Sequence, residues 1–275
     1  MTLPAAQTDP SEVVPVLAHL YGGNEQDFAQ MLPQLKAAWV VRDSTGKTAG
    51  AVGLRPSPAH GMEVMGGAFP GPEQDAAALA LMMAAQAVHP HLYAYAEAHL
   101  LPAAALEAAG LRRVSAYTRM TGPVPTPMTP VLDGFRIVPL SEVHGPQDRL
   151  TAQRMYSDRI GHTHVPDEAG QPGFGDSDET LGRLAHDGSG VPAGLCRAWL
   201  AGDTLSLLTP GVRPDLRDTG LRRALLLRVC QAARAAGATR LELDAWGDTE
   251  AERAEDEALG LSVQTQTPIY SSLPR

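Results

Sequence analysis

A short segment between Gly211 and Arg223, Gly-Val-Arg-Pro-Asp-Leu-Arg-Asp-Thr-Gly-Leu-Arg-Arg, has the residue types that bind phosphate. It joins a strand-like run, 204–208, to an amphipathic helix. The first N–H groups of a helix have no partner within it, and its dipole favours negative charge there. Gly220 lets the backbone approach a ligand closely. Positive side chains crowd the same helix start, which is unfavourable for the helix unless an anion lies between them: Arg217, Arg222 and Arg223.

Two familiar phosphate-binding patterns are absent from this segment. No Gly-Lys-Ser/Thr follows the turn, so it is not a Walker loop. The turn holds a single glycine, Gly220, so the glycine spacing of a dinucleotide-binding fold is missing too. Solvated arginines on an ordinary turn are the alternative, and we favour the anion site.

The second half of the chain alternates strand-like and helix-like runs around this segment. We expect strands at 135–138, 195–200, 204–208, 241–244 and 264–270, and helices at 147–160, 221–236 and 249–259. The runs at 195–200 and 204–208 predict a hairpin, and Thr249 with Glu252 predicts a capping box at the start of the last helix.

The first half shows a similar series. Its runs predict strands at 38–41, 49–54, 62–65, 92–96 and 114–120, and helices at 72–88 and 102–109. The closing helices of the two halves also match, 106–111 with 256–261. Four prolines between 121 and 130 are incompatible with a helix or a central strand. The sequence therefore predicts two domains, 1–121 and 135–275, joined by a proline-rich linker, 122–134.

The two halves differ at the start of the helix that follows the central strands, which is predicted at 72–88 in the first half and at 221–236 in the second. In the first half it opens Gly71-Pro72-Glu73-Gln74-Asp75, where acidic residues suit the helix dipole but would repel a phosphate. Pro72 also removes one N–H donor. We therefore expect the anion site in the second domain only.

Val212-Arg213-Pro214 followed by Arg217-Asp218-Thr219-Gly220-Leu221-Arg222 resembles the acyl-CoA loop of the GNAT N-acetyltransferase superfamily. That loop reads Val-x-Pro, then Arg or Gln, two residues, Gly, one residue, and Gly or Ala. Two positions depart from it, because Arg222 stands where a small residue is usual and Asp218 where Gly or Arg is common. The layout of two such halves is similar to that of mycothiol synthase, a tandem GNAT protein.

The resemblance implies an α/β (α+β) fold with two GNAT-like domains, each a mixed, largely antiparallel sheet flanked by helices. It implies acetyl-CoA as co-substrate, with the pantetheine arm along the backbone near Val212 and the acetyl carbon near 205–208. The residues that it assigns to the cofactor are Leu208, Val212, Arg217, Asp218, Thr219, Gly220, Leu221, Arg222 and Arg223.

Transfer of an acetyl group to an amine needs a base for the amine and a proton for the leaving thiolate. The family often uses a tyrosine on the helix after the fifth strand, but the helix predicted at 249–259 has none. The substitutes are Tyr270 on the last strand, Asp244 at a strand end and His164 in a loop. Their structural alternatives are a strand residue, a cap and an exposed loop residue. His162 and His164 lack an obvious third ligand, so we expect no metal.

Composition limits the partners and the location. The chain has 275 residues, a net charge of −9 and no long basic run, which makes nucleic acid and anionic membranes unlikely partners by charge. Its two cysteines are too few for a disulfide framework. No signal peptide or spanning segment is evident in the sequence, so we expect a cytoplasmic protein. A homodimer formed through sheet edges is an open alternative.

The sequence thus predicts an N-acetyltransferase that acts on a small-molecule amine by a direct ternary-complex mechanism. Glu242 and Asp244, which share one face of a strand, favour a cationic amine. The alternative is a catalytically inactive GNAT-like protein that binds acyl-CoA or serves as a scaffold or sensor. The acceptor, the acyl group and the general base are left open.

Overall fold

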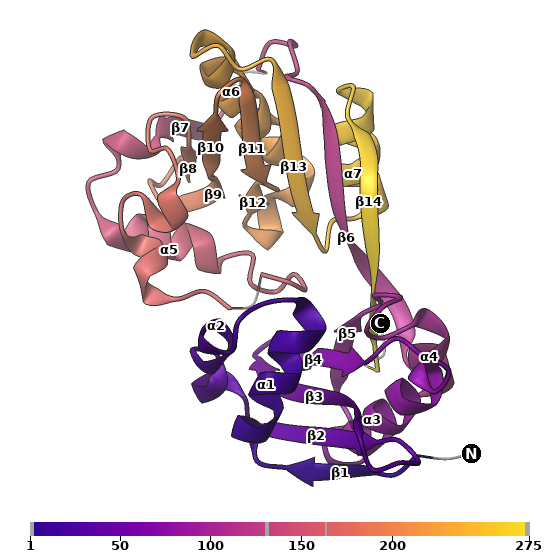
Figure 1. Ribbon diagram of the computed structural model, residues 1–275. Coiled ribbons are helices and arrows are strands. Elements are labelled where there is room, and N and C mark those ends of the chain that lie inside the picture. Colours follow the sequence, from indigo (N-terminus) through magenta and orange to yellow (C-terminus); the bar gives the residue numbers. More distant parts are fainter. Residues whose placement is uncertain (1–2, 130–131, 163, 273–275) are drawn as a thin grey trace. The chain divides into compact units, whose positions relative to one another are not determined.

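Two units of secondary structure divide the chain, and two long strands contribute to both of them. The computed structural model describes residues 3–129, 132–162 and 164–272. The first unit comprises residues 1–116 and 267–275, and the second comprises residues 117–266 (Figure 1). Each unit is a mixed α/β structure with a largely antiparallel sheet, as the sequence predicts.

These units differ from the predicted domains at both ends of the second one. Strand β6, Arg112–Pro123, crosses from the first unit into the second, so residues 122 and 123 of the predicted linker are strand. Strand β14, Ser262–Ser271, begins in the second unit and ends in the first. The difference arises because the division between the two units falls within both long strands.

The first unit is built on a sheet with α1 and α3 on opposite faces. Its strand order is β1-β2-β3-β4-β5-β14, in which only β4 and β5 are parallel neighbours. The strands other than β14 are β1 Ala5–Thr8, β2 Ala37–Arg42, β3 Thr48–Ser57, β4 Gly61–Ala68 and β5 Leu92–Tyr95. The helices are α1 Pro10–Tyr21, α2 Glu25–Ala29, α3 Gln74–Val88 and α4 Ala103–Ala108, with a 3₁₀ turn at Leu32–Gln34.

Alternation along the strands explains this layering. Trp39 and Val52 pack with α3, whereas Ala38 and Ala51 pack with Leu17 of α1, as the period of two in a strand requires. Strand β1 and helices α1 and α2 were not predicted from the sequence. Helix α1 has Pro15 in its interior, which weakens the helical signal, although the Asp9 side chain caps its start.

The second unit contains two sheets. The larger has the order β14-β6-β13-β11-β10, and the smaller has the order β12-β9-β8-β7. Their strands are β7 Phe135–Pro139, β8 Arg183–Asp187, β9 Pro192–Cys196, β10 Ala198–Ala201, β11 Thr204–Leu208, β12 Gly211–Val212 and β13 Arg240–Trp246. The predicted strand at 195–200 is thus broken at Arg197, while β10 and β11 form the predicted hairpin.

Helix α6, Leu221–Ala235, lies against the larger sheet and buries four leucines in the core of this unit: Leu221, Leu225, Leu226 and Leu227. The capping box between Thr249 and Glu252 is present at the start of α7, Glu250–Ala258. Helix α5, Pro146–Arg154, ends earlier than predicted. Four 3₁₀ segments complete the unit: Leu140–Glu142, Asp167–Gly170, Phe174–Asp176 and η5, Pro214–Thr219. Within the described ranges, no helix is long and apolar enough to span a membrane.

Candidate functional site

Strands β11 and β13 separate at the point where the predicted cofactor segment begins. They pair in parallel as far as Leu208 and Asp244. The Thr209 N–H then donates to the Asp244 carbonyl oxygen at 2.8 Å, and the chain leaves the larger sheet. Strand β12 follows and pairs with β9 in the smaller sheet. The second unit therefore has two parallel strands that diverge beside the loop leading to α6.

This loop forms a 3₁₀ segment, a left-handed glycine and then a helix. Gly220 has φ +80 and precedes α6, whose first turn has no side-chain cap. Thr219 and Asp218 are exposed, whereas Leu221 and Val212 are buried. The Thr219 hydroxyl donates to the Leu216 carbonyl oxygen at 2.6 Å. The residues that lead into the helix are thus on the surface, and the binding of an anion there stays a prediction.

Two arginines before α6 are held by carboxylates of the second unit. Arg217 makes two hydrogen bonds to Asp158, at 2.7 and 2.9 Å. Arg213 binds Asp215 and Asp187, at 2.8 and 3.0 Å. The N–H donors of each guanidinium already bind a carboxylate. To contact a pyrophosphate, each arginine would therefore have to leave or share its carboxylate partner.

Arg222 lies inside the second unit rather than on the loop surface. It is 4% exposed, and its two terminal nitrogens bind both carboxylate oxygens of Asp256 at 2.9 and 2.7 Å. Nη2 also donates to Asp248 at 2.8 Å and to Thr209 at 3.0 Å. Burial alone would lower the pKa of Arg222, but the neighbouring carboxylates outweigh burial and raise it. Its side chain therefore connects α6 to α7.

Arg223 is the remaining cation of the predicted set. It is half-exposed in the first turn of α6 and makes no ion pair or hydrogen bond with the part of the chain that the structure describes. The contact of the cofactor with Arg223, with the helix amides and with the other assigned residues stays a prediction. Of these side chains, Arg223 is the charge available to a phosphate without breaking an internal pair.

A second ion pair lies next to Arg222. Arg159 binds both oxygens of Glu252 at 2.7 Å. Burial opposes ionisation of Glu252, but hydrogen bonds from Arg159 and the Thr249 amide dominate and lower its pKa to about 2. These contacts join the segment after α5 to the start of α7. The cluster is thus a structural clamp around the divergence point.

His162, one half of the His-x-His pattern, is buried beside this cluster. It is 8% exposed, and its ring packs edge-on against Tyr156 and Trp246, with centroids 4.9 and 6.4 Å away. Burial lowers its pKa to about 4, so the ring is neutral near pH 7. His164 is half-buried. Among the described residues, no group of three or more His, Cys, Asp or Glu is arranged to hold a metal ion.

Asp244 lies at the divergence point and binds two side chains of β6. Its Oδ1 accepts the Tyr117 hydroxyl and the Arg119 Nε, both at 2.8 Å, and its Oδ2 accepts Arg119 Nη2 at 3.1 Å. The Tyr117 ring stacks against Trp246 at 4.4 Å between centroids. Burial and the bond to Asp244 raise the pKa of Tyr117 to about 12, so the phenol keeps its proton.

Tyr117 is the residue that sequence reasoning missed. The register of β6 and β13 sets Arg119 opposite Asp244 and Tyr117 opposite Trp246. A tyrosine therefore reaches the divergence point from a strand rather than from the helix that follows β13. The only sequence signal is a phenol near the end of the first half, and nothing local connects it to Asp244.

Tyr270 belongs to the first unit. It lies opposite Ala94 of β5, is 6% exposed, and donates its hydroxyl to Glu107 at 2.8 Å. This bond to a carboxylate raises the pKa of Tyr270. Of the three predicted catalytic residues, Asp244 is the one that the structure sets at the divergence of β11 and β13.

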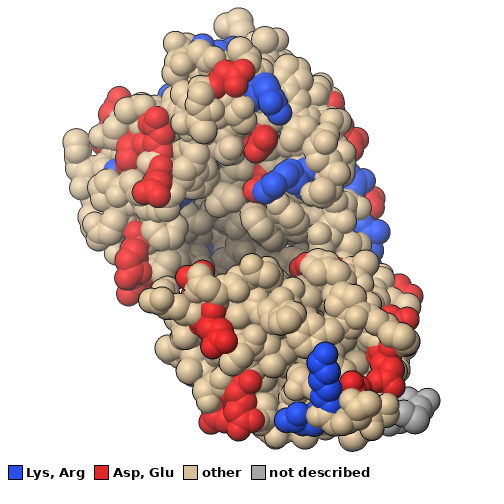
Figure 2. All heavy atoms as spheres, viewed as in Figure 1, with Lys and Arg blue, Asp and Glu red and all other residues tan. Residues whose placement is uncertain are grey.

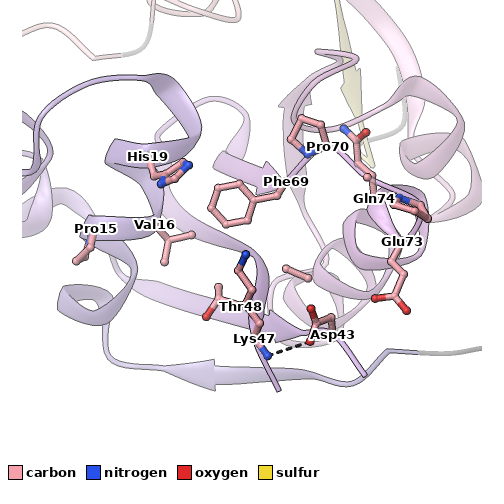
Figure 3. Close-up of a pocket in the computed structure, with 13 residues that line it drawn as sticks. Pro15, Val16, His19, Asp43, Lys47, Thr48, Phe69, Pro70, Glu73 and Gln74 are labelled. Carbon is pink, nitrogen blue, oxygen red and sulfur yellow. Dashed lines mark hydrogen bonds between the residues drawn. The ribbon is translucent and has the colours of Figure 1, made fainter. Parts of the chain in front are cut away.

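The first unit has its own cavity where the chain passes from β4 to α3. The cavity has a volume of about 720 Å³ and is lined by α1, the β2–β3 turn and residues 69–74. Figure 3 shows His19 and Phe69 on one side of it and Glu73 and Gln74 on the other, and the two rings of the first pair lie 5.0 Å apart. Asp43 holds the Lys47 amide in the turn below. The acidic helix start is as predicted, so a pyrophosphate is disfavoured here.

The strands of the first unit that correspond in order to β11 and β13 also diverge, but a loop bridges them. β4 and β5 pair over two positions only, Met62 with Leu92 and Glu63 with Tyr93. Beyond these, the Ala68 N–H donates to the Leu100 carbonyl oxygen at 2.9 Å. A Cβ at Gly67 would lie 2.4 Å from that oxygen. The segment after β5 therefore covers the end of β4.

The face of the molecule drawn in Figure 2 carries no broad basic surface. Acidic side chains are scattered over both units, and lysines and arginines lie singly or in small groups among them. The lack of a broad basic surface on this face agrees with the net charge of −9.

The sequence matches no protein-family model and no curated protein. The structure is similar to solved structures along almost its whole length. A GCN5-related N-acetyltransferase from Sphaerobacter thermophilus has a TM-score of 0.53 and 19% identity, covering 99% of this chain and 96% of that one. A tandem GNAT protein from the clavulanic acid biosynthesis pathway has a TM-score of 0.54 and 17% identity, covering 99% of both chains.

A probable N-acyltransferase from Enterococcus faecalis has a TM-score of 0.60 and 10% identity, covering 98% of this chain and 72% of that one. At these identities the likeness concerns the fold. The chain has the fold of the GNAT N-acetyltransferase superfamily. Like the tandem GNAT protein, the chain has two compact α/β units in one polypeptide.

Proposed function

We propose that this protein is an acyl-CoA-dependent N-acyltransferase that transfers an acetyl group from acetyl-CoA to the amine of a small molecule. The observation that carries the proposal is the divergence of β11 and β13 beside the exposed start of α6. The names of the structurally similar proteins, N-acetyltransferases, support the same reaction class. The cytoplasmic location and the absence of nucleic-acid or membrane partners belong to the same proposal.

The helix start has the chemistry that a pyrophosphate needs. Its first amides are not capped by a side chain, and the helix dipole makes this end positive. Arg223 adds a charge with no internal partner among the described residues. Asp218 is exposed, so its carboxylate can turn to solvent instead of facing a phosphate. The other residues of the segment would contribute backbone N–H groups. Gly220 has open space around it, so a phosphate can approach the backbone closely there.

Asp244 and Tyr117 would carry the proton steps. The amine nitrogen attacks the thioester carbonyl carbon, the carbon–sulfur bond breaks, and one proton must move from nitrogen to sulfur. Asp244 attracts the ammonium, which loses one proton to solvent before it attacks. Asp244 then accepts the proton that the attacking nitrogen loses, directly or through a water. Tyr117 keeps its proton at neutral pH, gives it to the leaving sulfur and regains one from Asp244 through their 2.8 Å hydrogen bond. Arg119 compensates the charge on Asp244.

Calorimetric titration with acetyl-CoA tests where the co-substrate binds. We expect micromolar affinity, about −8 kcal/mol, for the wild-type protein. Arg223→Glu and Gly220→Glu should each weaken binding at least about tenfold by placing a negative charge at the anion site. Arg228→Glu makes the same charge change on an exposed position of the same helix, and it should bind as the wild type does.

Two outcomes would contradict this assignment. Binding that is lost in Lys47→Glu but kept in Arg223→Glu would move the co-substrate to the first unit, where Lys47 lines the cavity. A wild-type protein that binds no acetyl-CoA would exclude the reaction altogether.

A protein that binds acyl-CoA without turnover is the second candidate. The observation in its favour is that Arg213, Arg217 and Arg222 are all held by internal carboxylates, which leaves fewer groups for tight binding and catalysis. The two candidates differ in the release of free CoA thiol. With a panel of small amines, the enzyme releases thiol in proportion to amine, whereas the binding protein keeps acetyl-CoA intact.

A further inference from the structure

A second cavity of the first unit lies in the gap between β4 and β5. Its volume is about 280 Å³, and its walls come from α1, α2, β4, β5 and the segment after β5. Leu100 and Leu101 of that segment close one side of it. The reaction proposed above makes no use of this cavity.

Aromatic rings form one wall of the cavity. Tyr21 and Phe28 are stacked with centroids 5.5 Å apart and an angle of 15° between their planes. The Tyr21 hydroxyl accepts the N–H of Gly66 at 2.9 Å, which fixes the ring in position. Gly66 has φ +100, and a Cβ there would lie 2.4 Å from the Ala51 carbonyl oxygen, so the strand can offer this N–H only with glycine at the position.

A third ring, Tyr95, lines the cavity from β5. Burial raises the pKa of Tyr95 far above its usual value, and nearby Glu63 raises it further. The phenol is therefore neutral at any physiological pH. Its ring lies 6.4 Å from that of Tyr93, centroid to centroid. The cavity is thus lined by aromatic rings without a negative phenolate.

Carboxylates supply the polar lining. Glu63 is 8% exposed, and its Oε2 accepts Arg55 at 2.6 Å and the Tyr93 hydroxyl at 3.0 Å. Glu97 also lines the cavity, with about a third of its side chain exposed, and His99 lies 3.6 Å from it on the surface. Arg55 offsets the charge of one carboxylate only. The lining therefore keeps a negative charge in a partly desolvated site, where it acts strongly on a ligand.

We propose that this cavity binds a small organic ammonium ion, held by the aromatic rings and by the carboxylates of Glu63 and Glu97. Aromatic rings attract a cation over their faces, and the attraction grows as the site is desolvated. A neutral ligand of the same shape would gain the apolar contacts but not this attraction. The site is separate from the acyl-CoA loop of the second unit, so this proposal does not depend on the transfer reaction.

Binding of choline and of its neutral isostere, 3,3-dimethylbutan-1-ol, tests the proposal by calorimetry on the full chain without acetyl-CoA. We expect choline to bind and the isostere to bind at least about tenfold more weakly. Phe28→Leu should weaken choline binding about threefold to tenfold by removing one ring. Glu97→Gln should weaken it by a similar factor, because the neutral amide keeps the shape and removes the charge.

The other cavity of the same unit provides matched controls. Phe69→Leu and Glu73→Gln make the same two changes in the lining of the 720 Å³ cavity, and both should leave choline binding unchanged. Equal binding of choline and its isostere would overturn the proposal in favour of an apolar site. Choline binding that responds only to the control variants, or no binding at millimolar choline, would overturn it as well. Thermal unfolding of each variant checks that the first unit stays folded.

Discussion

Arg222 in the first turn of α6 and Asp256 in α7 form a buried, bidentate ion pair. Both side chains are almost fully buried, and the two hydrogen bonds measure 2.9 and 2.7 Å. A cation that the sequence suggests for ligand binding is thus used to hold two helices together. Asp248 joins the pair from the loop between β13 and α7. The geometry of the divergence point depends on this contact.

Removing one member of this pair should destabilise the second unit strongly. Arg222→Met leaves Asp256 buried without its arginine partner and removes one of the two arginines beside Asp248, and we expect a loss of about 3–5 kcal/mol in the free energy of unfolding. The double variant Arg222→Met/Asp256→Leu should lose less than the single variant. Urea unfolding followed by tryptophan fluorescence measures this. Arg253→Met breaks an exposed pair of α7 and should cost under about 1 kcal/mol; a similar cost for Arg222→Met would argue against a structural clamp.

Tyr117→Phe should lower kcat by a factor of about 100 or more and leave the KM for acetyl-CoA unchanged, because the hydroxyl acts on the leaving sulfur and not on binding. Steady-state kinetics with a responsive amine provide the measurement. Tyr270→Phe removes a phenol hydroxyl from the first unit and should keep full activity. If Tyr270→Phe lost activity and Tyr117→Phe did not, the assignment from the sequence would be right and ours wrong.

Acid should destabilise the second unit through His162. Its pKa falls from the ordinary 6.5 to about 4 in the folded state, so the unfolded state binds more protons between these values. The contribution of the neutral ring is complete above pH 6.5 and is lost as the pH falls toward 4, by about 2 kcal/mol at pH 5. Urea unfolding at several pH values should show a shallower loss in His162→Gln. His144→Gln, at an exposed position, should keep the wild-type slope; equal slopes in all three proteins would exclude His162.

Gly211→Ala should disturb the strand that leads to the cofactor loop. A Cβ at this position would lie 1.8 Å from Tyr156 Cε1, so the ring or β12 must move. We expect a loss of about 1–3 kcal/mol in the free energy of unfolding. Gly145→Ala has open space around its Cβ and should cost well under that. Equal costs for both variants would mean that Tyr156 adjusts freely and that β12 is not fixed by this contact.

Local patterns predicted much of the second unit correctly. The hairpin of β10 and β11, the strand–loop–helix around Gly220 and the capping box of α7 all depend on residues close in sequence. The hydrogen-bond and ion-pair partners of individual side chains could not be predicted from such local patterns. The sequence assigned Arg222 to an anion site because its partner, Asp256, lies 34 positions later in α7, and no local pattern connects the two residues.

The pairing of Tyr117 with Asp244 shows where such prediction ends. The two residues are 127 positions apart and meet only through the register of β6 on β13. Tyr270 was assigned to the second domain because its strand starts there, but β14 continues into the first unit. The contact of Tyr117 with Asp244 and the position of Tyr270 both depend on strand length and strand pairing, which are set by the whole fold.

The insertion of β14 beside β5 also sets an order of events during synthesis. Ile269, Tyr270 and Ser271 pair with β5 and so complete the sheet of the first unit. The ribosome makes this segment after all the other strands of that sheet. Until then the edge of β5 is open to other chains. Domains generally complete themselves from the N-terminus as they are translated. Here the half that is translated first is finished last, and a nascent chain stalled before residue 267 would leave that edge unpaired.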